Sequence, residues 1–229
     1  MKRLCLILPA FNESKMLGKV LLSLKKYLCS LADIETEIVV VDDGSRDGTH
    51  KIALEHNCVV LRHVLNRGLG GALATGLVYA KRHQFDVALT MDSDGQHDPN
   101  DILPALKPIL RDECDVVIGT RMVGQDGMPF DRKVLNFLSN ALTFILFQVW
   151  SSDSQSGFRV FGKKALELIT VKTQGMEVSS EFFAEIRKNK LRYKEVPITV
   201  IYSDYSRKKG QSNFNSIPIT LKLLLRLFR

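Results

Sequence analysis

Short runs of apolar, often β-branched residues alternate with helical patterns through the first half of the chain. The apolar runs predict strands at residues 3–8, 37–41, 59–61, 87–91 and 116–118. The stretches between them predict helices at residues 15–31, 47–55, 70–82 and 100–110. Alternating strands and helices are typical of a mostly parallel sheet with helices on both faces. We therefore predict an α/β fold.

The pattern changes after residue 119, where a loop precedes a long helical stretch at residues 133–150. After a turn rich in serine and aspartate we predict a strand at 158–161, a helix at 179–190, a strand at 194–202 and a C-terminal helix. No internal repeat or low-complexity linker divides the chain. One domain is therefore predicted for residues 1–229.

Composition narrows the class of protein. The 229 residues are 45% hydrophobic and 25% charged, which excludes collagen-like and disordered chains. No apolar run reaches the roughly 18 to 20 residues that a membrane-spanning helix needs, and the N-terminus enters a strand directly. The four cysteines lie far apart, with no CxxC pair. We expect a cytosolic protein with reduced core cysteines, no signal peptide and no zinc site.

The net charge of +7 conceals an uneven distribution, because residues 187–229 contain eleven basic and two acidic residues. Lys222, Arg226 and Arg229 recur at helical spacing near the end, opposite apolar side chains. Residues 135–150 form a second amphipathic stretch, which carries a polar stripe. Both patterns are typical of helices that lie on a membrane surface or dock on a partner. The alternative is two helices packed against the domain.

Polar clusters follow the predicted strands at residues 9–13, 42–45, 66–68 and 92–94. In open α/β sheets, ligands bind outside the carboxyl ends of the strands. We therefore expect all four clusters to converge on one crevice.

Asp92 and Asp94 place two carboxylates, one residue apart, at the end of a strand. Neighbouring negative charges repel unless a cation or hydrogen-bond donors neutralise them. Carboxylate oxygens suit Mg²⁺ or Mn²⁺, which usually share their coordination with substrate phosphates. A turn or helix cap is the alternative for such a pair. The position after the fourth strand favours a metal-bridged diphosphate.

Asp42 and Asp43 have two open interpretations. An aspartate at such a crevice commonly binds a ribose or a base edge, but Asp43 and Asp47 could instead cap the next helix.

The glycine-rich segment 68–73 fails the GxGxxG dinucleotide fingerprint because its last position is Leu73. It still predicts a helix N-terminus beside a diphosphate.

Arg121, Arg132 and Arg207 follow the predicted fifth strand, precede the long helix and open a basic loop, respectively. Each alone is typical of a solvated surface charge. Beside a metal-diphosphate site, the three together would suit a second phosphate.

Seven motifs, in order along essentially the whole chain, resemble family 2 glycosyltransferases and, within them, the dolichyl- or polyprenyl-phosphate sugar synthases. The motifs are Pro9-Ala10-Phe11-Asn12-Glu13, Val41-Asp42-Asp43-Gly44-Ser45, Arg67-Gly68-Leu69-Gly70, Asp92-Ser93-Asp94-Gly95-Gln96, Gly119-Thr120-Arg121, Asp153-Ser154-Gln155-Ser156-Gly157-Phe158-Arg159 and Glu195-Val196-Pro197-Ile198.

The resemblance implies a GT-A fold, a nucleotide-sugar donor, Mg²⁺ or Mn²⁺, and an inverting transfer. It implies a nucleotide-sugar site made of Pro9, Ala10, Asn12, Glu13, Asp42, Asp43, Arg67, Gly70, Asp92 and Ser93. The implied metal ligands are Asp92, Asp94 and Gln96. The implied catalytic set is Asp94, Asp153, Arg121, Arg132 and Arg207, in which the arginines bind phosphate and Asp153 lines the acceptor side. Residues 1–119 would then bind the donor, 120–212 the acceptor and 213–229 a membrane or a partner.

Three departures qualify the resemblance. Asn213 follows Ser212 where the family usually has a lysine, so one phosphate contact is in doubt. The QxxRW motif of processive polysaccharide synthases is absent, which argues against polymerisation. No transmembrane pair follows, so the chain resembles synthases that dock on a membrane or on a membrane-anchoring subunit.

We expect transfer of a hexose from GDP-mannose or UDP-glucose to polyprenyl or dolichyl phosphate, by a protein peripheral to the cytoplasmic face of a membrane. One alternative is a family 2 transferase acting on a hydroxyl of a cell-surface glycan. Another is a basic protein that binds a membrane or nucleic acid without catalysis, although no nucleic-acid motif is present.

Overall fold

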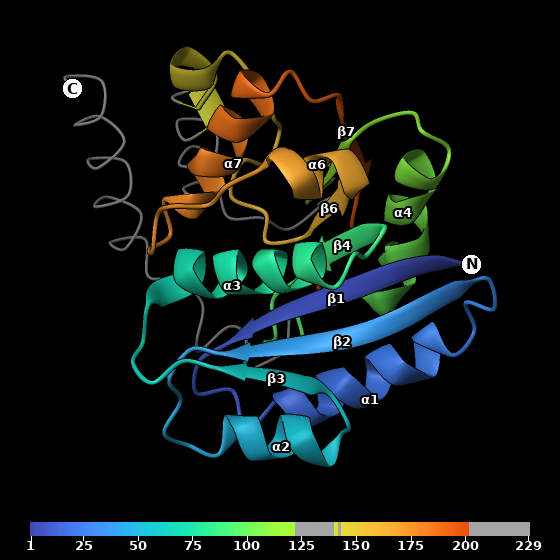
Figure 1. The fold of residues 1–229 in the computed structure, drawn as a ribbon, viewed down its shortest axis with the longest axis vertical. Helices are drawn as coiled ribbons and strands as arrows, with labels where there is room; N and C mark the ends of the chain where they lie inside the picture. Colours follow the sequence, from blue (N-terminus) through green and yellow to red (C-terminus); the bar gives the residue numbers. More distant parts are fainter. Residues whose placement is uncertain (122–139, 142, 202–229) are drawn as a thin grey trace.

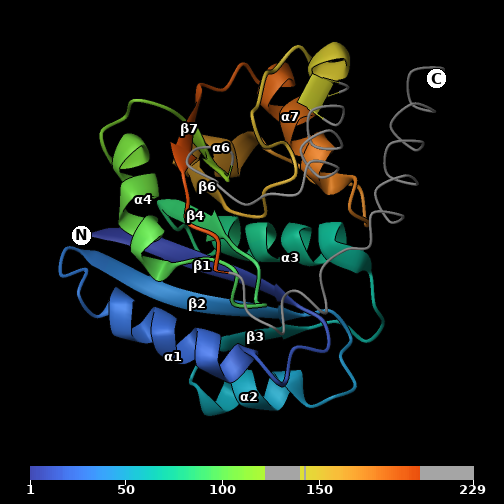
Figure 2. The same ribbon diagram turned by 180° about the vertical axis from the view of Figure 1, so that it is seen from behind.

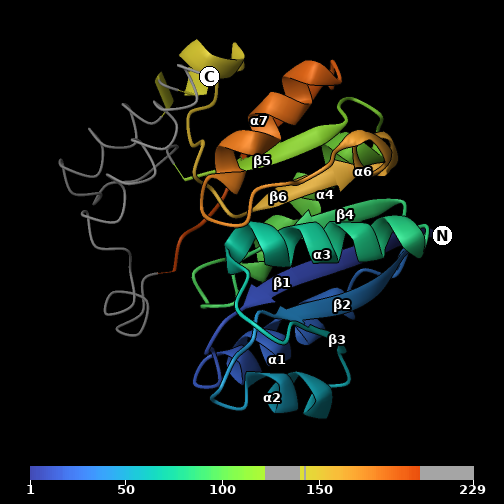
Figure 3. The ribbon, with the colours of Figure 1, turned by 60° about the vertical axis from the view of Figure 1, so that its left-hand side comes forward.

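The computed structural model describes residues 1–121, 140–141 and 143–201. Seven strands form one sheet in the order β3-β2-β1-β4-β6-β5-β7, and Figure 3 shows this order for the first six. Their bounds are β1 Lys2–Ala10, β2 Ile34–Asp42, β3 Val59–Arg62, β4 Val87–Thr90, β5 Val116–Thr120, β6 Arg159–Gly162 and β7 Tyr193–Pro197. The α/β prediction is confirmed.

The sheet is mixed but mostly parallel. β1 pairs in parallel with β2 and β4, β2 with β3, and β5 with β7. β6 runs antiparallel to both of its neighbours, β4 and β5. The carboxyl ends of the parallel strands therefore share one edge of the sheet, while β6 begins there, directly after the Ser156-Gly157-Phe158 segment.

Helices cover both faces of the sheet. Their bounds are α1 Leu17–Leu28, α2 Thr49–Glu55, α3 Gly68–Arg82, η1 Pro99–Asp101, α4 Ile102–Leu110, α6 Lys163–Leu168 and α7 Val178–Lys188. The first core joins α1, α2 and α4 to one face, and the second joins α3, α6 and α7 to the other. The two groups lie on opposite sides of the strands (Figures 1 and 2).

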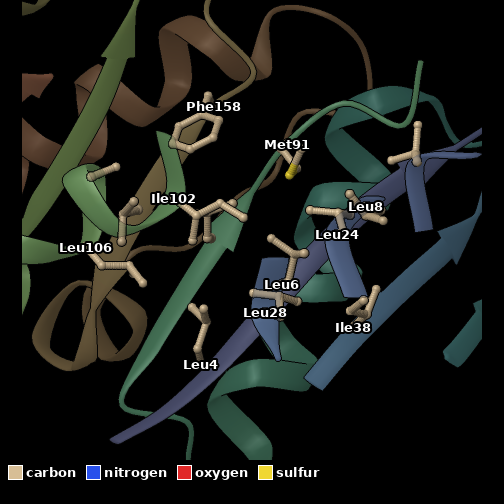
Figure 4. Close-up of a cluster of buried hydrophobic side chains, with 14 of the residues drawn as sticks. Leu4, Leu6, Leu8, Leu24, Leu28, Ile38, Met91, Ile102, Leu106 and Phe158 are labelled. Atoms are coloured by element: carbon tan, nitrogen blue, oxygen red, sulfur yellow. The ribbon is translucent and has the colours of Figure 1, made fainter. Parts of the chain in front are cut away.

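Strand alternation sorts the core residues between the two faces. Leu4, Leu6 and Leu8 of β1 enter the first core, whereas Cys5 and Ile7 enter the second. Figure 4 shows the first core, where the β1 leucines lie with side chains of α1 and α4. Because successive side chains of a strand point to opposite faces, a strand buried on both sides is apolar throughout. This accounts for the continuous apolar runs in the sequence.

Several element boundaries differ from prediction. α3 begins at Gly68 rather than residue 70, and η1 precedes α4 within the predicted 100–110 helix. Helix α6 was not predicted. β7 ends at Pro197, not at residue 202, and the chain beyond it turns to the loop after β4, where Val200 bridges His97. The C-terminal helix and residues 133–139 and 142 of the predicted 133–150 helix lie outside the described residues, whereas residues 140–141 and 143–147 are helical.

The cysteines follow prediction with one correction. Cys5, Cys58 and Cys114 are buried and free, but Cys29 is exposed just after α1. Burial raises the pKa of the Cys114 thiol to about 11, so this thiol is inert near neutral pH. Within residues 1–121, 140–141 and 143–201, no helix combines the length and the apolar character needed to cross a bilayer.

Candidate active site

Hydrogen bonds join the loops that follow β1, β2 and β4. The Asn12 N–H donates to Ser45 Oγ at 2.9 Å, and Ser93 Oγ donates to the carbonyl of Pro9 at 2.8 Å. The Glu13 N–H donates to Thr49 Oγ1 at 2.9 Å. The predicted convergence of these polar clusters at one edge of the sheet is therefore present in the structure.

Asp42 is fully buried at the end of β2 and stabilises the following turn. Its Oδ1 accepts the Ser45 N–H at 2.9 Å, and its Oδ2 lies 3.2 Å from Arg62 Nε. Asn12 contributes from the neighbouring loop, because its Oδ1 accepts the Arg46 N–H at 3.0 Å. Two predicted donor-binding residues thus hold the shape of the loops at this edge.

Asp43 caps helix α3, the later of the two helices that follow it. Its carboxylate accepts the N–H groups of Arg67 at 2.8 Å and of Gly68 at 2.7 Å, where α3 begins. His63 Nδ1 lies 2.6 Å from the same carboxylate. Of the two residues predicted as possible caps of the next helix, α2, Asp47 lies just before the N-cap residue Gly48 and accepts the Thr49 N–H at 3.1 Å, whereas Asp43 binds the start of α3. Base or ribose binding by Asp43 stays a prediction.

Several N–H groups at the start of α3, where the sequence predicts a diphosphate site, donate to acceptors within the protein. The N–H of Gly70 donates to the carbonyl of Gln174 at 2.8 Å, and the Gly71 N–H donates to the same oxygen at 3.3 Å. A Cβ atom on Gly70 would lie 2.2 Å from the carbonyl oxygen of Thr173. The glycine therefore permits close packing of the 173–175 segment, and its N–H is not available to a diphosphate. The side chain of Arg67 remains a predicted donor contact.

Asp92 and Asp94 follow β4 and differ in their surroundings. Burial and the negative charge of Asp92 raise the pKa of Asp94, whose oxygens accept the Gln96 N–H at 3.0 Å and Gln96 Nε2 at 2.9 Å. Burial opposes ionisation of Asp92, but His97, whose Nε2 lies 3.4 Å away, together with the positive charges of Arg121 and Arg159, outweighs this effect and lowers the pKa of Asp92. The loop thus holds two carboxylates with unequal proton affinity.

Asp92 and Asp94 are suited to bind a divalent ion whose coordination shell is completed by substrate oxygens. Among the described residues, no cluster of three or more His, Cys, Asp or Glu side chains could hold a metal by itself. Mg²⁺ and Mn²⁺ are commonly bound by one or two carboxylates together with substrate phosphates and water. The repulsion that raises the pKa of Asp94 is the repulsion that such an ion would relieve. In this conformation Gln96 turns its amide nitrogen to Asp94, so its role as a ligand stays a prediction.

Arg121 and Asp153 form a tight ion pair on the predicted acceptor side. Arg121 Nε and Nη2 lie 2.6 Å and 2.7 Å from the two oxygens of Asp153, and the Arg121 N–H donates at 3.1 Å. Asp153 is 0% exposed, whereas the Arg121 side chain is 27% exposed. The guanidinium therefore offers a partly open cationic edge with a fixed orientation. Arg132 and Arg207, the other two predicted arginines, lie outside the described residues.

Arg159 ends the Asp153–Arg159 motif and lies at the site, although it was not among the predicted site residues. It is 1% exposed, its Nη2 donates to the Ser154 carbonyl at 3.2 Å, and its guanidinium lies 4.9 Å from the Phe182 ring centre. Burial lowers its pKa to about 10, although Asp92 and Asp153 both favour its charged form. Arg159 thus links the two carboxylates electrostatically. Its motif was visible in the sequence, but the burial of its charge was not.

The Ser-Gly-Phe-Arg motif has glycine at position 157 for a steric reason. A Cβ atom at this position would lie 2.6 Å from both carboxylate oxygens of Asp92. The turn into β6 therefore passes directly over the Asp92 carboxylate, and a side chain there would displace it.

Replacing Arg159 with methionine should destabilise the fold by about 3 kcal/mol, because Asp92 and Asp153 would lose a buried positive charge. Urea unfolding measures this change. Arg111→Met is the control, since the Arg111 side chain is 69% exposed and its nearest acidic partner is 3.9 Å away. Equal stability of the two variants would contradict the account of Arg159.

Residues 5–170 match the family model of glycosyl transferase family 2. An uncharacterized protein of Methanocaldococcus jannaschii is 41% identical, over 96% of this chain and 90% of the relative. UDP-N-acetylglucosamine–dolichyl-phosphate N-acetylglucosaminyltransferase of Methanococcus voltae is 35% identical, over 98% of this chain and 96% of the relative. Undecaprenyl-phosphate mannosyltransferase of Micrococcus luteus is 29% identical, over 90% of this chain and 87% of the relative.

Solved structures share the fold. Mannosyl-3-phosphoglycerate synthase from Rubrobacter xylanophilus has a TM-score of 0.70 at 18% identity, covering 100% of this chain and 74% of its own. A second solved structure is glucosyl-3-phosphoglycerate synthase from Mycobacterium tuberculosis, in complex with Mn²⁺, UDP and glucosyl-3-phosphoglycerate. Its TM-score is 0.68 at 18% identity, and the match covers 97% of this chain and 80% of the synthase. The predicted GT-A type of fold is thereby confirmed.

Proposed function

We propose that this chain, which belongs to glycosyl transferase family 2, transfers one sugar from a nucleotide sugar to the phosphate of a polyprenyl or dolichyl lipid. The protein is a glycosyltransferase by its family. The lipid-phosphate acceptor is supported by the relatives from Methanococcus voltae and Micrococcus luteus, whose names specify dolichyl phosphate and undecaprenyl phosphate. Residues 1–119 would bind the donor and 120–212 the acceptor.

The observation that carries the proposal is the ion pair of Arg121 with Asp153. A carboxylate already bound by both nitrogens of a guanidinium fork is poorly placed to take a proton from a sugar hydroxyl. A partly exposed guanidinium is well suited to a phosphate. The arrangement thus favours an acceptor that needs orientation more than deprotonation.

A lipid phosphate meets that requirement. A phosphomonoester has its second pKa at about 6, so near neutral pH its oxygens are already charged nucleophiles. Arg121, held by Asp153, would orient the phosphate toward the anomeric carbon. A divalent ion at Asp92 and Asp94, when bound, would neutralise charge on the departing nucleoside diphosphate. Arg159, which interacts electrostatically with Asp92 and Asp153, would supply a buried positive charge between these two half-sites.

The donor is proposed to be a GDP- or UDP-linked hexose or N-acetylhexosamine. The name of the Methanococcus voltae relative adds UDP-N-acetylglucosamine to the GDP-mannose and UDP-glucose that the motifs imply. The experiment is incubation of the protein with each nucleotide sugar, polyprenyl phosphate and either Mg²⁺ or Mn²⁺. Formation of a lipid-linked sugar from one donor supports the proposal, and absence of product from every donor contradicts it.

We also propose that the protein works on a membrane surface, at the cytoplasmic face. Apolar side chains are exposed next to the segment that carries Asp153, with Phe144 at 45%, Ile145 at 67% and Trp150 at 49%. The rings of Phe144 and Trp150 pack edge to face with centres 5.8 Å apart. Aromatic and aliphatic side chains of this kind favour the membrane interface. The predicted basic helix at residues 213–229 lies outside the described residues and stays part of this proposal.

The double variant Ile145→Ser, Trp150→Ser should bind anionic vesicles roughly thirtyfold more weakly, because about 2 kcal/mol of apolar burial would be lost. Vesicle co-sedimentation measures the partitioning. Leu22→Ser, Leu54→Ser is the control pair, since these leucines of α1 and α2 are 61% and 58% exposed and lie on the other face of the sheet. Equal weakening by both pairs would argue against docking through residues 144–150.

A further inference from the structure

The segment that carries Asp153 is fastened to strand β7 by one carboxylate. We propose that Glu195 is a positioning residue, which sets the place of Asp153 and, through it, the orientation of Arg121. The inference rests on the proposed function, because it concerns how the phosphate-binding guanidinium is held. It assigns a role to a side chain that touches neither the donor-side carboxylates nor Arg121 itself in any described hydrogen bond.

Both oxygens of Glu195 are directed at the segment before Asp153. Oε1 accepts Ser151 Oγ at 2.6 Å and the Ser152 N–H at 2.8 Å. Oε2 accepts Ser152 Oγ at 2.9 Å. Three donors from two successive residues thus converge on one carboxylate, and the partners are separated by more than 40 residues in sequence. This is a tertiary contact and not a feature of a local turn.

Hydroxyl groups extend this contact to both members of the ion pair. Ser151 Oγ donates to Glu195 and accepts the Asp153 N–H at 3.2 Å, so Glu195 reaches Asp153 through a single hydroxyl. Ser152 Oγ gives its one proton to Glu195, which requires Thr120 Oγ1 to be the donor in their 2.7 Å contact. Thr120 directly precedes Arg121. The network therefore connects the Glu195 carboxylate both to Asp153 and to Thr120, the residue before Arg121.

The sheet makes Glu195 a rigid reference point. β7 pairs in parallel with β5, with Glu195 beside Ile118 and Pro197 beside Thr120. Arg121 follows β5 at once, so it leaves the sheet from the strand that lies against Glu195. The distance between the guanidinium and the Asp153 carboxylate is thus set by two neighbouring strands. A site built on rigid elements holds its geometry better than one built on loops alone.

The test compares Glu195→Leu, Glu195→Gln and the control Glu113→Leu. Glu113 also lies against β7, but its partner is Lys194 at 2.7 Å, away from the Asp153 segment. We expect Glu195→Leu to lower kcat/KM for polyprenyl phosphate roughly thirtyfold, while the Kd of the nucleoside diphosphate with Mn²⁺ changes less than about twofold. Glu113→Leu should leave both quantities unchanged.

Glutamine should rescue most of the activity, because the hydroxyls of the network can reverse. Its carbonyl can accept from Ser151 Oγ and the Ser152 N–H, and its amide nitrogen can donate to Ser152 Oγ, which then donates to Thr120. Positioning thus predicts activity within about threefold of wild type for Glu195→Gln. A glutamine variant as inactive as Glu195→Leu would overturn the inference, because it would show that the negative charge of Glu195, and not its hydrogen bonding, is what activity requires.

The decisive experiment measures whether the effect of Glu195→Leu depends on Asp153. If Glu195 acts through Asp153, Glu195→Leu should change activity less than about twofold in an Asp153→Asn background. Loss of the same factor in both backgrounds would overturn the inference. Ser151→Ala provides a second variant that removes one hydroxyl, should Glu195→Leu fail to fold. It should lower kcat/KM for the lipid phosphate about fivefold, and full activity of this variant would also count against the inference.

Failure of the proposed function is distinguishable from failure of this inference. If the wild-type protein transfers no sugar to polyprenyl phosphate, the proposed function fails. Crystal structures of the wild type and of Glu195→Leu then decide the inference without any substrate. We expect Asp153 to lose its two-point contact with Arg121 in the variant, and an unchanged contact would overturn the inference.

Discussion

Replacing Asp94 with asparagine should lower metal-dependent transfer roughly thousandfold while leaving the fold intact. Asparagine keeps the size of the side chain and can still accept the hydrogen bond from the Gln96 N–H, but it removes one anionic oxygen ligand. Initial rates over a titration of Mn²⁺ measure the effect. Asp98→Asn is the control, because Asp98 caps η1 and lies outside the carboxylate pair.

Acidification should weaken metal binding by the wild-type protein. Burial and Asp92 raise the pKa of Asp94, so protons compete with the ion as the pH falls through that raised value. Asp98→Asn should retain this dependence and Asp94→Asn should lose most of it. Full activity of Asp94→Asn at limiting Mn²⁺ would contradict the metal assignment.

The second large effect is expected at Arg121. Arg121→Lys should reduce transfer to polyprenyl phosphate several hundredfold, because an ammonium cannot hold Asp153 at two points and still present a planar edge to phosphate. Hydrolysis of the nucleotide sugar should fall far less. The ratio of transferred to hydrolysed sugar measures this difference directly.

Arg192→Lys is the matched control for Arg121. Arg192 also binds carboxylates through its guanidinium, with Nη2 2.6 Å from Asp112 and 3.1 Å from Asp115, but it does so next to the first residue of β7. This control should leave the ratio unchanged. Equal losses of transfer and hydrolysis in Arg121→Lys would move Arg121 to the donor side.

Much of the fold follows from local pattern, and the exceptions have physical reasons. Strands β1 to β5 are short apolar runs because both faces of the sheet are covered, and this pattern is visible in a single sequence. The antiparallel direction of β6 was beyond reach, because residues 158–161 would be equally apolar in either direction. β7 ends level with its neighbour β5, whose last residue, Thr120, pairs with Pro197 and accepts the Ile198 N–H at 3.0 Å. Ile201 then donates its N–H to the carbonyl of Gln96.

The site predictions rest on residue type, and the sequence alone could not reveal the tertiary contacts that these residues make. Two carboxylates after a strand are informative in any sequence, as at Asp92 and Asp94. Arg67 and Gln174, which hydrogen-bond to Asp43 and Gly70, lie 24 and 104 residues away from them in sequence, so the use of Asp43 and Gly70 in packing could not be foreseen. Arg159 is not distinguishable from a surface charge until its burial is known. Arg132 and Arg207 stay predictions.

The nature of the acceptor tests the account most directly. Wild-type protein, the preferred nucleotide sugar and Mn²⁺ should be incubated in parallel with polyprenyl phosphate and with the unphosphorylated polyprenol of the same length. We predict a lipid-linked sugar from the phosphate alone, released by mild acid as expected for a sugar phosphodiester. Transfer to the polyprenol, or an acid-stable glycoside as the product, would contradict transfer to phosphate.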